Sequence, residues 1–175
     1  MKSIIGTLAF AGLLAVSACG DNRVDPDRRY LVEPRASAAR TTPLHANETA
    51  ELRRLINKYA AEYQVPVDLV HRVVIRESRH RPGARNGPYY GLMQMLPATA
   101  RGMGYKGGAS GLLDAETNLK YGVKYLRGAY LVAGGNHDAA VKWYSRGYYY
   151  EAKRKGLLDE TGLGKDRVRR RLPDA

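Results

Sequence analysis

The sequence predicts a mainly α-helical protein with a single folded domain, and three observations support this. Apolar residues recur with helical spacing from Glu48 onward, as they do in helices that bury one face. No segment alternates apolar and polar side chains over the length of a convincing strand. The 175 residues also correspond to one ordinary domain with a linker or tail.

The first 18 residues have the pattern of a secretory signal peptide. Lys2 precedes an apolar run, Ile4 to Val16, that carries no charge. This run is too short to cross a bilayer core of about 30 Å as a helix, but it suits the apolar region of a signal peptide. A buried core helix is the alternative, although such helices seldom lack polar residues on every face. We therefore expect a signal peptide at 1–18.

The segment Val16-Ser17-Ala18-Cys19 resembles a bacterial lipobox, in which the cysteine is lipidated and becomes the mature N-terminus. Cys19 is the single cysteine of the chain, so it cannot form an internal disulfide. Two or more acyl chains give stable membrane anchoring. Ordinary cleavage near Ala18, with Cys19 left free, is the alternative. We expect a lipoprotein on the periplasmic side of the bacterial cell envelope.

The chain is strongly basic, with a formal net charge of +12. Outside the cytoplasm, such a charge attracts anionic envelope polymers or lipid headgroups. Nucleic acid is the other usual partner, but the secretory signal argues against it and the sequence shows no nucleic-acid motif. His71, His80 and His137 are scattered along the sequence, so we expect surface or packing histidines, no metal site and no cofactor.

A flexible linker and a basic tail are expected outside the domain. Residues 19–47 contain three prolines, mixed charges and few apolar residues, so they cannot bury enough surface to offset the entropy cost of ordering. As a flexible linker they would span roughly 30 Å. Residues 157–175 are expected to be a basic C-terminal tail, either a solvated end or a segment attracted to anionic envelope material.

Helices are expected between residues 48 and 156. The first follows a plausible N-cap at Asn47. The second begins at Pro66, where the missing backbone N–H needs no partner, and a third, short helix begins at Pro97. The remaining helices are placed at 115–132, at 138–144 and after Gly147.

Glu77 is the candidate catalytic residue. It lies one turn beyond Val73 and Val74 on the apolar face of the second helix, so its carboxyl group should be partly desolvated. Desolvation raises the pKa of a carboxyl group, and a carboxyl that is protonated near neutral pH can act as a general acid. The alternative is a helix-end glutamate that turns to solvent or pairs with Arg76 or Arg81.

No Asp or Glu follows Glu77 before Asp114. Ordinary glycosidases use two carboxyl groups, about 5–5.5 Å apart when retaining and roughly 6.5–9.5 Å apart when inverting. A substrate that carries its own nucleophilic hydroxyl needs no second carboxylate to activate water. The acid-free segment is consistent with such a substrate, although Asp114, Glu116 or Glu151 could fold close to Glu77.

Four motifs between Glu48 and Tyr148 carry a family resemblance. They are Glu77-Ser78 followed by Pro82-x-Ala84, GLMQM-x-P-x-TA at 91–100, TNLKYGVKYL at 117–126 and AAVKWYSRG at 139–147. In this order they resemble the lytic transglycosylases of the soluble type, relatives of goose-type lysozyme. The resemblance implies a single lysozyme-like helical domain, placed here at 48–156, with a saccharide-binding cleft.

The resemblance also implies an activity. It implies cleavage of the β-1,4 MurNAc–GlcNAc bond in the glycan strands of peptidoglycan. The MurNAc C6 hydroxyl attacks in place of water and leaves a 1,6-anhydro end, and Glu77 acts as the acid and then as the base. The residues that the resemblance puts in or near the substrate-binding cleft are Ser78, Met93, Gln94, Tyr144 and Ser145.

Some positions depart from the family pattern. Asn86 stands near a usual serine, and Ser145-Arg146 replace the usual Asn-Ala. The alternatives to a transglycosylase are a hydrolytic lysozyme that recruits one of the later acids, and a non-enzymatic peptidoglycan-binding module. The sequence also leaves open whether the protein remodels the wall generally or opens it for an envelope-spanning secretion or conjugation apparatus.

Overall fold

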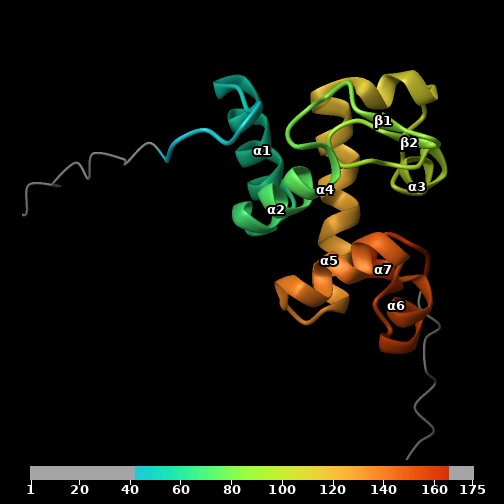
Figure 1. Ribbon diagram of the computed structural model, residues 1–175. Coiled ribbons are helices and arrows are strands. Elements are labelled where there is room, and N and C mark those ends of the chain that lie inside the picture. The colour runs from blue at the N-terminus through green and yellow to red at the C-terminus, as the bar shows by residue number, and fades with distance from the viewer. Residues whose placement is uncertain (1–41, 166–175) are drawn as a thin grey trace, which may run out of the picture. The chain divides into compact units, whose positions relative to one another are not determined.

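The computed structural model describes residues 42–165, which are mainly helical (Figure 1). The expected signal peptide, Cys19 and most of the expected linker lie outside this range. The helices are α1 (Ala50–Glu62), α2 (Val67–Ser78), α3 (Pro97–Gly102), α4 (Ala115–Val132), α5 (His137–Arg146), α6 (Tyr149–Lys155) and α7 (Leu158–Thr161), with a 3-10 helix, η1 (Ala109–Leu113), before α4. The mainly α class predicted from the sequence is confirmed.

The long helix α4 is the centre of the fold. Helices α1, α3, α5, α6 and α7 all pack against it, as Figure 1 shows for the helix that runs through the middle of the domain. Asp114 caps its N-terminus by accepting a hydrogen bond from the Thr117 N–H at 2.8 Å. Leu119, Val123 and Leu126 lie fully buried on one side. The predicted bounds of this helix, 115–132, are confirmed.

The first helix begins later than predicted. The Thr49 side chain caps α1 by accepting from the Leu52 N–H at 3.1 Å. Asn47, the predicted cap, instead has a left-handed backbone with φ of 63°. Its side-chain amide donates to the Arg79 carbonyl at 3.1 Å, so it joins the chain before α1 to the end of α2. The cap moved because Asn47 is used in a contact between distant segments.

A hairpin of two strands, each two residues long, is the one sheet within residues 42–165. Strands β1 (Arg85–Asn86) and β2 (Tyr89–Tyr90) pair antiparallel, with Arg85 opposite Tyr90 and Asn86 opposite Tyr89. Tyr90 then forms an isolated bridge with Met95. This places the hairpin against the start of α3 and shapes the loop that follows Glu77.

Packed structure extends past residue 156, where the sequence analysis placed the start of a tail. Gly156 has φ of 67° and turns the chain, after which Leu158 and Thr161 are buried. Helix α7 packs on α4 and α6, so residues 157–161 belong to the folded unit. Within residues 42–165, no helix combines the length and apolar character needed to cross a bilayer.

Candidate active site

A cleft with a volume of about 520 Å³ lies between three parts of the fold. These parts are the end of α2, the hairpin with the loop that leads into α3, and the end of α5; Tyr125 of α4 also lines the cleft. A second hollow adjoins it and shares Glu77, Asn86 and Gln94 with the cleft. Glu77 therefore stands where the two cavities meet.

Glu77 occupies the second-last position of α2, and 22% of its side chain is exposed. Burial raises the pKa of its carboxyl group, while the charge of Arg76 opposes this rise without cancelling it. The Arg76 Nε lies 3.6 Å from Glu77 Oε1, and no group within residues 42–165 donates a hydrogen bond to the carboxyl. The position predicted from the valine face thus yields a half-buried acid whose pKa lies above that of an exposed glutamate.

Gln94 lies at the tip of the loop between β2 and α3 and lines both cavities. Its backbone is left-handed, with φ of 47°, an uncommon conformation for a residue other than glycine. Its side-chain Nε2 donates to the carbonyls of Ala84 and Gly91 at 3.2 and 2.8 Å. The amide therefore fixes the loop, and its oxygen has no donor within the described part of the chain.

Asn118 of α4 holds this loop in place, and the sequence analysis identified it only as part of a motif. Its Oδ1 accepts from the Met93 N–H at 2.8 Å, and its Nδ2 donates to Tyr90 O and Leu112 O at 2.8 and 2.7 Å. The side chain is fully buried. A Cβ at Gly91 would lie 2.3 Å from Asn118 Nδ2, so the glycine lets the backbone approach the amide. The sequence offered one signal for this role: Asn118 is a polar residue on the apolar face of a predicted helix.

Tyr144 lines the cleft, yet its hydroxyl is used inside the protein. It donates to the Met93 carbonyl at 2.8 Å, and 8% of the residue is exposed. Burial above all, together with the nearby charge of Glu77, holds the pKa of Tyr144 well above its usual value, so the hydroxyl remains a neutral donor. Tyr144 therefore ties α5 to the loop that carries Gln94.

The other expected cleft residues divide into two groups. Ser145 lines the cleft, and its hydroxyl donates to the Val141 carbonyl at 3.0 Å. Ser78 and Met93 are buried and do not line it. The Ser78 hydroxyl donates to the Val74 carbonyl at 3.2 Å, while Met93 packs against the backbone of α4. These two residues support the walls of the site from behind.

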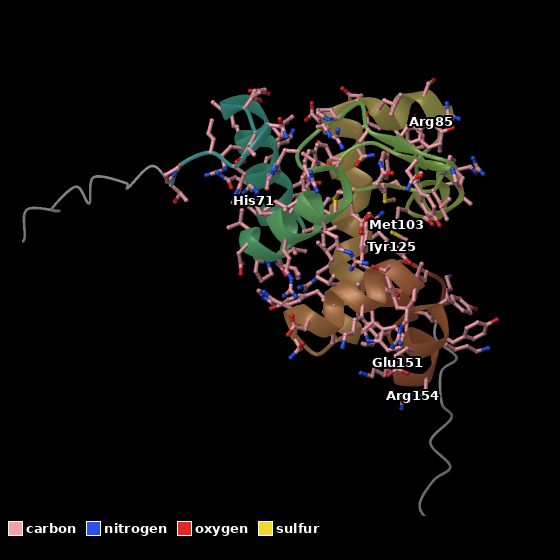
Figure 2. The ribbon with its side chains drawn as sticks, viewed as in Figure 1. His71, Arg85, Met103, Tyr125, Glu151 and Arg154 are labelled. Atoms are coloured by element: carbon pink, nitrogen blue, oxygen red, sulfur yellow. The ribbon has the colours of Figure 1, made fainter. Side chains whose placement is uncertain are left out.

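The three acids that could have joined Glu77 all lie elsewhere. Asp114 caps α4, and Glu116 accepts hydrogen bonds from Lys58 at 2.6 Å and Tyr59 at 3.0 Å. Glu151 pairs with Arg154 on α6, and Figure 2 labels both residues. None of them lines the cleft or the hollow, and Glu77 is the only acid of residues 42–165 that does so.

The fold brings two of the scattered histidines together away from the cleft. His71, labelled on α2 in Figure 2, lies with its Nδ1 3.2 Å from His80 Nε2. His45, Glu48 and His71 offer potential ligand atoms within 4.8 Å of one another. However, Arg53 donates to both Glu48 oxygens, each at 2.6 Å, so that carboxylate is already neutralised. This arrangement suits packing better than metal binding.

Comparison with models of protein families gives a match within the described part of the chain. Residues 54–158 match the model of the family described as "Transglycosylase SLT domain". The matched region covers more than half of the chain. It includes Glu77, the hairpin, the loop with Gln94 and both α4 and α5.

Proposed function

The chain belongs to the transglycosylase SLT domain family, and from that premise we propose that it cleaves the β-1,4 MurNAc–GlcNAc bond of peptidoglycan without water. Membership confirms the resemblance carried by the four motifs and points to a lytic transglycosylase that acts on peptidoglycan in the bacterial envelope. The products in this proposal carry 1,6-anhydro-MurNAc ends.

In the proposed reaction Glu77 serves twice. Its protonated carboxyl gives a proton to the glycosidic oxygen as the bond between that oxygen and MurNAc C1 breaks. The oxygen of the MurNAc C6 hydroxyl then forms a bond to C1, and its proton passes to the Glu77 carboxylate. Burial, which raises the pKa of Glu77, favours the protonated form that the first step needs.

The observation that carries the proposal is the isolation of Glu77. It is the only acid of the described residues that lines the cleft or the adjoining hollow. A glycosidase that uses a second carboxylate, either as nucleophile or as the base that activates water, would place that group about 5–9.5 Å from the first. The three candidates for such a group are held in a helix cap or in ion pairs on other faces. A substrate hydroxyl as nucleophile removes the need for one.

The test compares the wild-type chain with Glu77→Gln on purified peptidoglycan. The variant keeps the size of the side chain but cannot exchange the proton, and general acid–base steps are worth about 10²–10⁴-fold each. Glu151→Gln is the matched control, since it changes a paired glutamate away from the cleft. Wild-type muropeptides should be lighter by one water than the corresponding lysozyme products in mass analysis.

The outcomes separate the alternatives. Ordinary reducing ends on the wild-type products would exclude the transglycosylase reaction and favour hydrolysis. Absence of turnover, with retained binding, would favour a non-enzymatic module. Near-normal turnover by Glu77→Gln would remove Glu77 from the chemistry.

Because burial penalises the ionised carboxylate, the Glu77→Gln variant should melt no lower than the wild type at pH 8.

We also propose that Cys19 anchors the protein to a membrane as a lipoprotein. The support is its place directly after the apolar run and Val16-Ser17-Ala18. Cys19→Ser should release the protein into the soluble envelope fraction. A variant that still sediments with membranes after a high-salt wash would show that lipid attachment does not hold it.

A further inference from the structure

The cleft and the adjoining hollow carry a strong excess of positive charge. Arg76 and Arg146 line the cleft, and Arg81 and Arg85 line the hollow, where the same single acid, Glu77, faces them. Low-dielectric walls of one sign concentrate the field and attract ligands of the opposite sign. An uncharged glycan gives such a cavity nothing to pair with, so the charge points to an anionic part of the ligand.

Arg146 is the arginine best placed to bind that part. It is the last residue of α5, and its guanidinium carbon lies 3.9 Å from the centre of the Trp143 ring. Stacking on an indole face orients the guanidinium and leaves its N–H groups directed at the edge. Gly147, with φ of 83°, then turns the chain away. The side chain is therefore held in place at the rim of the cleft.

The charge of Arg146 is also unused within the described part of the protein. No carboxylate of residues 42–165 pairs with it, and it makes no hydrogen bond there. By contrast, Arg76 lies beside Glu77, and Arg72 pairs with Asp138 outside the cleft. Arg81 donates its Nε to the Ser78 carbonyl at 3.0 Å. An oriented and unpaired guanidinium favours a planar anion, because its fork of N–H groups matches a carboxylate.

We propose that Arg146 determines specificity by binding a free carboxylate on the peptide stems of the peptidoglycan substrate. This inference rests on the proposed function, which supplies the glycan in the cleft. The lactyl carboxyl of MurNAc is consumed in the amide bond to each stem, so the free carboxylates of the polymer belong to its peptides. The residue distinguishes stem-bearing strands with free carboxylates from strands whose carboxylates are amidated.

The experiment measures binding to the full chain carrying Glu77→Gln, so that the ligand is not consumed. One ligand is a peptidoglycan tetrasaccharide with its peptide stems, and the other is the same compound after conversion of its carboxyl groups to primary amides. Titration calorimetry gives Kd for each ligand, first with the Glu77→Gln chain and then with a chain that also carries Arg146→Ala. The control is Arg101→Ala, which removes another exposed arginine that lines neither cavity.

The native ligand should bind the Glu77→Gln chain about tenfold more tightly than the amidated ligand, the size expected for one charge-assisted hydrogen-bonded pair. Adding Arg146→Ala should remove that difference by weakening the native ligand alone, and Arg146→Lys should restore part of it. Arg101→Ala should change neither Kd by more than about twofold, as expected of a surface substitution.

Equal binding of the two ligands would overturn the inference, and so would an equal loss of both on removing Arg146. Failure of the proposed function is a separate result. Preference for the native ligand with no anhydro product from the wild type would retain Arg146 as a carboxylate site and reject the transglycosylase. Anhydro products without a preference for the native ligand would retain the transglycosylase and reject Arg146 as a carboxylate site.

Discussion

Asn118→Leu should destabilise the protein strongly, although the two side chains have similar size. The amide of Asn118 makes three hydrogen bonds to the backbone, to Met93 N, Tyr90 O and Leu112 O. Leucine would leave all three groups without this partner. Two of these bonds are fully buried and the bond to Tyr90 is partly so, which sets the size of the effect.

An unsatisfied buried polar group costs about 1–3 kcal/mol. Counting the Met93 N–H and the Leu112 carbonyl in full, and leaving out the partly solvated Tyr90 carbonyl, the loss is about 2–6 kcal/mol. For a domain of this size each kcal/mol lowers the melting temperature by about 4 °C. The variant should therefore melt at least about 8 °C below the wild type.

Thermal and urea unfolding of the two chains measure this loss. Asn57→Leu is the control, because Asn57 lies exposed on α1 and a surface substitution stays within about 0.5 kcal/mol. At low pH Asn118→Asp should lose less stability than Asn118→Leu, since a protonated carboxyl can still accept from the Met93 N–H. The loss should grow as pH rises, because an ionised carboxylate would face two carbonyl oxygens.

A melting temperature for Asn118→Leu within about 3 °C of the wild type, with the control unchanged, would refute the reasoning. It would mean that water or a shifted loop satisfies the three backbone groups. In that case the loop between β2 and α3 would not depend on α4 for its position. Equal losses at all pH values for Asn118→Asp would argue against the contacts with the two carbonyls.

Three further outcomes are expected. Stability in urea should fall as the pH drops from about 6.5 to 2, and a flat profile would contradict this. Burial lowers the pKa of His71 to about 4, so the unfolded chain takes up the His71 proton before the folded chain does. Burial raises the pKa of Glu48, but hydrogen bonds from Arg53 and the His45 N–H and the charges of His71 and Arg53 together lower it to about 2, so the stabilising charge of Glu48 is lost as the pH falls from about 4.5 to 2. Tyr144→Phe should cost about 1–3 kcal/mol in thermal unfolding by leaving the Met93 carbonyl unpaired, whereas unchanged stability with lower activity would show a hydroxyl that serves the substrate. Gly122→Ala should lower the stability by about 1–3 kcal/mol, because the added Cβ would lie 2.5 Å from the sulfur of Met93. A melting temperature equal to that of the wild type would show that the Met93 side chain moves freely.

The sequence determined the long helix α4 and the candidate acid. Helical periodicity predicted a helix at 115–132, and the structure has the same bounds. The valine face of α2 predicted a partly desolvated Glu77, and the carboxyl is half-buried on the cleft. These features depend on neighbours three or four positions away, so the local pattern contains the information that decides them.

Only the tertiary structure decided how the residues around Glu77 are used. Ser78 is adjacent to Glu77 in sequence but points into the protein, while Tyr144 reaches the Met93 carbonyl across 51 positions. Glu116 on α4 likewise accepts from Lys58 on α1, 58 positions away, and so faces away from the cleft. A hydroxyl or carboxylate has the same sequence signature whether it meets a backbone group, an arginine or a substrate. The packing of distant helices around α4 chooses among these partners, because a polar group that becomes buried must pair with whatever donor or acceptor the fold brings within reach.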